Sequence, residues 1–209
     1  MELTLHDYWR SSSAFRVRIA LNLKGADYRG VEVDLLANEQ LAEGYAAVNA
    51  QKLVPALEVD GQVITQSLAI IDWLDGAFPV PRLIPEDPLE RARTIALAQI
   101  IIADTQPLQN LRVLKYLRAQ FGADDAAVDQ WAQHWIGEGL AALEAQAPEE
   151  GYFGGTAPNI VDVVLVPQIM NARRYKLDLA PFPCLTRIDE AMHALDAVAQ
   201  AKPETLRPA

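Results

Sequence analysis

The order of apolar and polar positions over the first 78 residues is typical of short strands alternating with short helices. Leu3 and Leu5 alternate with polar neighbours, which predicts a short strand. After Ser11, apolar residues recur at helical spacing until Gly25, a residue suited to ending a helix. The same patterns predict, in order, a strand over 28–35, a helix over 40–48, strands over 53–59 and 62–65, and a helix over 67–78.

The last two of these strands are joined by Asp60-Gly61, a dipeptide favoured at the turn of a hairpin. The resulting element order, β-α-β-α-β-β-α, predicts a small α/β domain with a mixed sheet.

Four prolines, at 79, 81, 85 and 88, then fall within ten residues and predict a linker, because such a stretch cannot continue a helix. Asp87 followed by Pro88 is a helix start. From there the pattern is helical, with long Ala/Leu-rich segments near 89–120 and 125–147 and a capping-box-like start at 159–162. We therefore expect an α/β domain over 1–80, a linker over 81–87 and an all-α domain over 88–209.

Composition narrows the classes of function. A chain of 209 residues that is 51% hydrophobic can bury a sizeable core. The net charge of −10 argues against a nucleic-acid or anionic-membrane partner, and no apolar run approaches the roughly 18 residues that span a bilayer. With one cysteine, Cys184, and no export signal, we expect a cytoplasmic protein without an internal disulfide. The three histidines are too scattered to predict a metal site.

Candidate chemistry is concentrated in the serines Ser11, Ser12 and Ser13, which stand where the first helix begins. Unpaired N–H groups and the positive end of the helix dipole stabilise an anion there, and a thiolate is one such anion. The alternative is plain capping of the helix, which is the commoner role of serine at such a position.

Separated motifs along essentially the whole chain carry a resemblance to a known family. They are Arg10-Ser11-Ser12-Ser13, Leu53-Val54-Pro55-Ala56-Leu57, Gln66-Ser67-Leu68-Ala69-Ile70-Ile71, Gln106-Pro107-Leu108-Gln109-Asn110-Leu111, Leu165-Val166-Pro167-Gln168 and Asn171-Ala172-Arg173-Arg174-Tyr175-Lys176-Leu177-Asp178-Leu179. In these motifs the chain resembles zeta-class glutathione transferases, the family of maleylacetoacetate and maleylpyruvate isomerases. The resemblance implies a thioredoxin-like domain followed by a helical domain.

The resemblance also implies that glutathione is the cofactor and that its sulfur is held by Ser11 and Ser12. It implies a cis peptide bond before Pro55, so that the Val54 backbone pairs with the cysteinyl backbone of the tripeptide. Gln66 and Ser67 would hold the γ-glutamyl carboxylate. The full set of glutathione-binding residues implied is Ser11, Ser12, Ser13, Gln40, Val54, Pro55, Gln66, Ser67, Gln106 and Asn110.

Three arginines, Arg10, Arg112 and Arg174, are implied to bind the carboxylates of a small dicarboxylate substrate, since guanidinium groups bind carboxylates bidentately and stay charged. Surface salt bridges are the alternative role of each. The family usually has cysteine where Ser13 stands, so any contribution of a protein thiol is absent here. Arg112 is informative because maleylpyruvate isomerase resembles this chain in having arginine there.

The expected activity is glutathione-dependent conversion of maleylacetoacetate to fumarylacetoacetate in aromatic amino-acid breakdown. Thiolate addition makes the cis double bond single, the enolate is stabilised by nearby donors, and rotation and elimination restore a trans alkene. The alternatives are maleylpyruvate isomerisation, conjugation or dehalogenation by a broader transferase, and a non-catalytic binding protein. Family members are usually homodimers, which the resemblance extends to this chain as an expectation.

Overall fold

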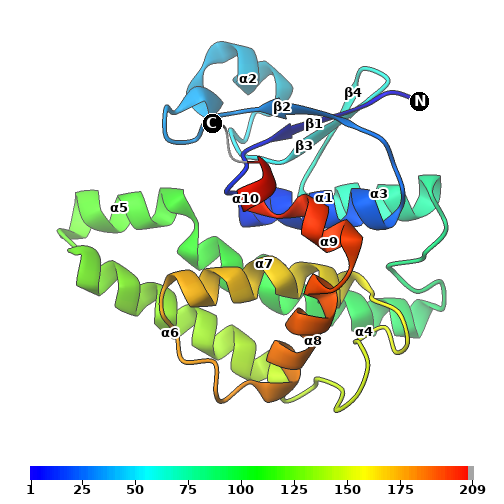
Figure 1. Ribbon diagram of the computed structural model, residues 1–209. Coiled ribbons are helices and arrows are strands. Elements are labelled where there is room, and N and C mark those ends of the chain that lie inside the picture. The colour runs from blue at the N-terminus through cyan, green and yellow to red at the C-terminus, as the bar shows by residue number, and fades with distance from the viewer. Residues whose placement is uncertain (207–209) are drawn as a thin grey trace. The chain divides into compact units, whose positions relative to one another are not determined.

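The structure is a computed structural model that describes residues 1–206 and contains two compact units (Figure 1). The first unit comprises residues 1–83 together with the C-terminal segment that begins at Ala194, and the second comprises Ile84–His193. Each unit has its own buried core.

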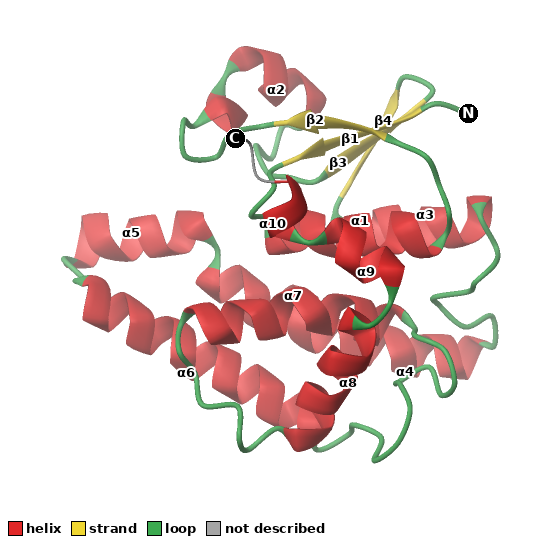
Figure 2. Cartoon of the chain, in the orientation of Figure 1, coloured by secondary structure: helices red, strands yellow, loops and turns green. Residues whose placement is uncertain are grey.

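The first unit is built on a four-stranded mixed sheet, as its element order predicted. Its strands are β1 (Leu3–Asp7), β2 (Arg29–Glu32), β3 (Ala56–Val59) and β4 (Gln62–Thr65), in the spatial order β2-β1-β3-β4 (Figure 2). β1 runs parallel to β2 and antiparallel to β3, and Asp60-Gly61 turns the chain between β3 and β4. The β-α-β-α-β-β-α order is confirmed.

The helices of this unit are α1 (Ser12–Leu23), α2 (Glu43–Val48), preceded by a 3₁₀ turn at Glu39–Leu41, and α3 (Ser67–Ala77). The predicted helix over 40–48 is therefore a 3₁₀ turn followed by a short α-helix. In α1 every residue from Ala14 to Leu21 is buried, so the helix is covered all round rather than on one face. A helix buried in this way has to place its polar residues, Arg16 and Arg18, inside the unit.

The C-terminal segment consists of α9 (Asp196–Ala201) and α10 (Pro203–Leu206), and α9 packs against α1. Side chains of α1 hold it: Arg18 Nε donates to the Ala201 carbonyl at 3.0 Å and Asn22 Nδ2 donates to the Ala197 carbonyl at 2.9 Å. The segment therefore groups with the α/β unit, whereas the sequence pattern assigned all of 88–209 to one helical domain. The periodicity of a short window cannot predict hydrogen bonds between residues more than 170 positions apart in the sequence.

The second unit is all-α. Its helices are α4 (Pro88–Gln99), α5 (Leu111–Phe121), α6 (Asp125–Glu144), α7 (Ile160–Arg174) and α8 (Pro183–His193). The helical segment expected over 89–120 is broken by a π-helical turn at Ile100–Thr105 and a 3₁₀ turn at Gln106–Gln109. Pro107 lacks the N–H that a continuous helix needs, which accounts for the break.

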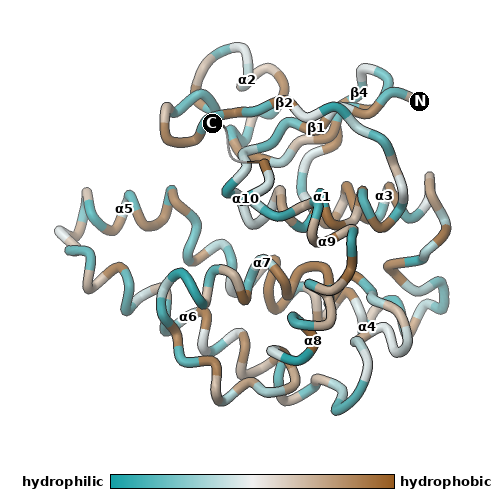
Figure 3. Tube along the Cα trace, viewed as in Figure 1, coloured by the Kyte–Doolittle hydropathy of each residue, from teal (hydrophilic) through white to brown (hydrophobic). Residues whose placement is uncertain are grey.

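Helix α7 forms the core of this unit. All but three of its residues are buried, and Figure 3 shows hydrophobic residues along it. Asn159 and Asp162 cap it by the predicted capping box: the Asp162 carboxylate accepts from the backbone N–H groups of Asn159, Phe153 and Gly154 at 2.8, 2.9 and 3.3 Å.

Candidate functional site

The start of α1 presents hydroxyls and backbone N–H groups directly after β1. Ser11 is the N-cap: its Oγ accepts from the Ala14 N–H at 3.2 Å, and its own N–H donates to the Tyr8 carbonyl at 2.8 Å. The hydroxyl proton of Ser11 can still be donated to a ligand, because capping uses only an oxygen lone pair. The first-turn N–H groups of Ser12 and Ser13 have no acceptor within the helix. The local field therefore favours a thiolate over a thiol.

The loop before β3 is held in place by α2. The peptide bond between Val54 and Pro55 is cis, as the family resemblance implied. Immediately before it, the Leu53 carbonyl accepts hydrogen bonds from Tyr45 Oη at 2.6 Å and Asn49 Nδ2 at 2.7 Å. Two donors on one carbonyl fix the backbone next to Val54, where the resemblance places backbone pairing with the tripeptide.

The start of α3 contains a backbone conformation that is rare for a residue other than glycine. Gln66 has φ +72° and ψ 119°, and its side chain donates through Nε2 to Gln51 Oε1 at 2.7 Å. Such conformations cost about 1–3 kcal/mol and cluster at ligand-binding positions. Gln66 is exposed whereas Ser67 is buried, so the chain enters α3 with the amide side chain outside and the hydroxyl inside. Sequence reasoning could not find this strain, because nothing in the residue type signals it.

Gln40, in the 3₁₀ turn before α2, is half-buried, and its Oε1 lacks a hydrogen-bond partner within residues 1–206. A buried oxygen without a donor is unfavourable unless a ligand or water supplies one. This orphaned acceptor suits the amide groups of a peptide ligand.

The remaining predicted residues are divided between the units. Arg10 lies exposed in the turn between β1 and α1. In the second unit, Gln106 lies in the 3₁₀ turn, and Asn110 caps α5 by accepting the Arg112 N–H at 3.1 Å. This capping occupies the side-chain oxygen of Asn110 and leaves its amide N–H groups for a ligand. Arg112 and Arg174 are exposed at the first turn of α5 and the last turn of α7.

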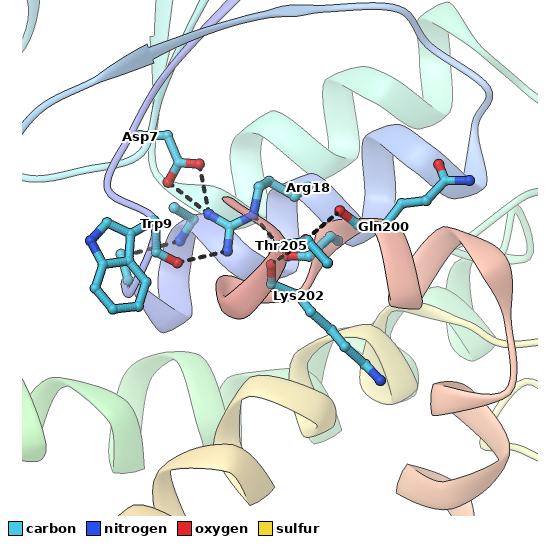
Figure 4. Close-up of polar contacts among 9 residues, drawn as sticks. Asp7, Trp9, Arg18, Gln200, Lys202 and Thr205 are labelled. Carbon is cyan, nitrogen blue, oxygen red and sulfur yellow. Dashed lines mark hydrogen bonds and ion pairs between the residues drawn. The ribbon is translucent and has the colours of Figure 1, made fainter. Parts of the chain in front are cut away.

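Two buried arginines of α1 were not among the predicted functional residues. Arg18 is fully buried, and its guanidinium contacts Asp7 and the Trp9 carbonyl, as Figure 4 shows. Arg16 is 1% exposed, and its Nη1 donates to Ser67 Oγ at 3.3 Å, which connects α1 to the first residue of α3. The signal that could have found them is an arginine within an otherwise apolar helical run.

Other kinds of site are not found in the part of the chain described here. Across residues 1–206, no three or more His, Cys, Asp or Glu side chains are grouped so that they could hold a metal ion. The helices within the same range are too short or too polar to cross a membrane.

Comparison with known proteins gives the family. The profile for the glutathione S-transferase N-terminal domain matches residues 1–76. Maleylacetoacetate isomerase of Rhizobium meliloti is 45% identical, over 99% of each chain. A solved bacterial zeta-class transferase, maleylpyruvate isomerase, superposes with a TM-score of 0.94 at 44% identity, over 98% of each chain. Maleylacetoacetate isomerase of Methylobacterium extorquens, solved with bound malonate and glutathione, is 39% identical with a TM-score of 0.92, over 99% of this chain and all of that one.

The fold is therefore that of a glutathione transferase. The chain belongs to the zeta-class family that includes these isomerases.

Proposed function

We propose that this protein is a glutathione-dependent cis–trans isomerase that converts maleylacetoacetate to fumarylacetoacetate. The relative named for that activity shares 45% of its residues over 99% of both chains, which carries the proposal. The hydroxyls and free N–H groups at the start of α1 supply the chemistry that the activity requires.

Glutathione, when bound, supplies a thiolate that adds to the conjugated double bond and leaves again after rotation, so the tripeptide is regenerated. In this proposal the Ser11 hydroxyl donates to the sulfur and the N-terminus of α1 adds its positive dipole, so both lower the pKa of the thiol. Ser12 is the second hydroxyl at this position. The Ala14 N–H holds the Ser11 oxygen and thereby orients its proton outward.

The residues of the first unit fit a tripeptide. The Val54 backbone, fixed through Leu53, pairs with the cysteinyl backbone, and Ser67 with the first N–H groups of α3 receives the γ-glutamyl carboxylate. Gln40 brings the unpartnered oxygen noted above. The further contacts proposed are with Ser13, Pro55, Gln66, Gln106 and Asn110.

Substrate binding requires positive charge on a chain whose net charge is −10. We assign the substrate carboxylates to Arg10, Arg112 and Arg174, because a guanidinium matches a carboxylate in shape and keeps its charge at every physiological pH. Malonate, a small dicarboxylate, is bound in the structure of the Methylobacterium relative, and this supports the substrate class.

Maleylpyruvate isomerisation is the second candidate function. The solved maleylpyruvate isomerase superposes on this chain with a TM-score of 0.94, and arginine at position 112 is the residue that the resemblance links to that activity. A cytoplasmic location, a role in tyrosine breakdown and a homodimeric assembly are further parts of the proposal, supported by family resemblance.

The deciding experiment measures isomerisation of maleylacetoacetate and of maleylpyruvate by the purified protein, with and without glutathione. Faster, glutathione-dependent turnover of maleylacetoacetate supports the main proposal. A preference for maleylpyruvate assigns the enzyme to the second candidate and makes Arg112 the first residue to substitute. Glutathione binding without turnover of either substrate would reject an isomerase and leave a conjugating transferase or a binding protein. The molar mass of the purified protein, measured by light scattering as it elutes from a size-exclusion column, tests the proposed homodimer.

A further inference from the structure

The two arginines buried in α1 differ in the charge of their partners: one has an anionic partner and the other a neutral one. Arg18 Nη1 donates to both carboxylate oxygens of Asp7, at 2.8 and 2.6 Å, so its charge is compensated. Arg16, two residues earlier and 1% exposed, donates only to the neutral hydroxyl of Ser67, at 3.3 Å. Its Nε has no hydrogen-bond partner within the described chain.

The charge of Arg16 is therefore uncompensated. None of the ion pairs found among residues 1–206 involves Arg16. Burial alone lowers the pKa of Arg16, to about 10, so the guanidinium still carries its positive charge at neutral pH. Folded proteins rarely bury a cation without an anion, because the lost hydration has to be offset by a partner.

The position of Arg16 indicates which anion would compensate it. Its guanidinium lies against Ser67, the first residue of α3, where the N–H groups of the first turn and the helix dipole already favour negative charge. Gln66, immediately before, has the strained backbone described above. A buried cation, a hydroxyl and a helix N-terminus thus meet at one point, and a ligand carboxylate is the group that satisfies all three.

We infer that Arg16 is a positioning residue for glutathione, which sets the affinity for the γ-glutamyl carboxylate through the hydroxyl of Ser67. This inference rests on the proposed function. Arg16 donates to the Ser67 oxygen, so the serine proton is left to point at the ligand. A hydroxyl that accepts a hydrogen bond from a cation is also a stronger donor, and the buried charge acts on the carboxylate through a poorly screening interior.

The test compares two ligands and two replacements by calorimetric titration. The ligands are glutathione and 4-aminobutyryl-cysteinyl-glycine, which keeps the thiol and the amino group but lacks the γ-glutamyl α-carboxylate. We expect Arg16→Met to weaken glutathione binding by about tenfold or more, and to change binding of the analogue by less than about twofold. Arg16→Lys, which keeps the charge, should retain part of the preference for glutathione. Arg118→Met, which removes an exposed arginine, should leave both affinities unchanged.

A purely structural role for Arg16 predicts different results. It predicts that Arg16→Met lowers the melting temperature of the ligand-free protein and weakens the binding of both ligands by the same factor. Either result overturns the inference. If instead the charge is retained for a ligand, the ligand-free Arg16→Met protein should melt at the wild-type temperature or above, because an apolar side chain replaces an uncompensated cation. If Arg16→Met does not fold, the wild type and Arg16→Lys decide. The inference is rejected if the wild type binds glutathione and the analogue with equal affinity and Arg16→Lys does the same.

Kinetics separates this inference from the proposed function. At saturating glutathione, Arg16→Met should keep the wild-type kcat and show a raised KM for glutathione, whereas a loss of kcat alone would contradict a role in cofactor affinity. Arg16-dependent binding of glutathione without isomerisation would reject the proposed function and leave the inference standing. A wild type that does not bind glutathione would overturn both.

Discussion

The Arg18 guanidinium joins Asp7, the last residue of β1, to the Ala201 carbonyl at the end of α9. The same group donates through Nη2 to the Trp9 carbonyl at 3.0 Å, one residue before Arg10 and two before Ser11 (Figure 4). Chain segments nearly 200 residues apart are thus fixed by one side chain to the turn that carries the proposed site.

Removing one partner of this ion pair should be strongly destabilising. Arg18→Met leaves the Asp7 carboxylate buried and unpaired, and we expect a loss of about 3–5 kcal/mol in the free energy of unfolding, measured in urea. The matched control is Arg118→Met, which breaks an exposed pair with Asp125 whose atoms are 2.9 Å apart, and it should cost less than about 1 kcal/mol. Equal losses in the two variants would show that burial of the Asp7 pair is unimportant.

Ionisation of Tyr45 should make the free energy of unfolding fall at alkaline pH. Burial raises the pKa of Tyr45 from its ordinary value of about 10 to about 12, and the neutral hydroxyl donates to the Leu53 carbonyl. Because the folded-state pKa is the higher one, this contribution is complete below pH 10 and is lost as the pH rises through 12. Relative to Tyr45→Phe, the free energy of unfolding of the wild type should therefore fall by about 3 kcal/mol between about pH 10 and about pH 12.

The measurement for Tyr45 is denaturant unfolding of both proteins at several pH values, with the difference between them plotted against pH. Other groups titrate equally in the two proteins, so they cancel. A difference that stays flat above pH 10 would show that the hydroxyl is not held in its neutral form by the fold.

Substitution of Ser11 should affect the bound thiol and not only the helix. We expect Ser11→Ala to raise the pKa of the glutathione thiol, read from the ultraviolet absorbance of the thiolate, and to lower kcat on the order of 100-fold. Loss of the N-cap should also cost about 1 kcal/mol of stability. The control is Asp87→Ala, which removes the N-cap of α4: it should cost similar stability and leave the thiol pKa and kcat unchanged. An unaltered thiol pKa in Ser11→Ala would reject the role of the hydroxyl.

The Asp162 carboxylate should contribute strongly to the stability of the second unit. Burial raises its pKa even though three backbone N–H groups donate to it, and removing the carboxylate leaves those donors without an acceptor. Asp162→Ala is expected to cost about 3 kcal/mol or more in the free energy of unfolding. Asp178→Ala, which removes an exposed carboxylate that accepts one backbone N–H at 3.0 Å, is the control and should cost under about 1 kcal/mol.

Two glycines of α6 should respond in opposite directions to alanine. A Cβ at Gly139 would stand 2.0 Å from Thr105 Oγ1, so Gly139→Ala forces the buried Thr105, at the end of the π-helical turn, to move and should cost about 1–3 kcal/mol. At Gly137 the nearest atom would be 3.9 Å away, and alanine there should stabilise the helix by up to about 1 kcal/mol. Thermal unfolding of the two variants checks both signs, and a stabilising Gly139→Ala would refute the close contact.

The local elements of this protein follow from its sequence. Alternation at Leu3 and Leu5, the turn at Asp60-Gly61 and the cap at Asn159 each act within a few residues, so they predict β1, the β3–β4 hairpin and the start of α7. The serines after Arg10 stand at a helix N-terminus for the same local reason. Pro107 acts locally as well, and the helical pattern over 89–120 is broken next to it because proline lacks the N–H of a continuous helix.

Tertiary structure decided the properties that depend on contacts between distant residues. The attachment of α9 to α1, the strained backbone of Gln66 and the donors on the Leu53 carbonyl arise from packing that no window of sequence contains. Arg16 and Arg18 are the same residue type in one apolar helical run. Only the fold places an aspartate beside one and a neutral serine beside the other, because the sign and distance of a neighbouring charge are set when separate segments pack together.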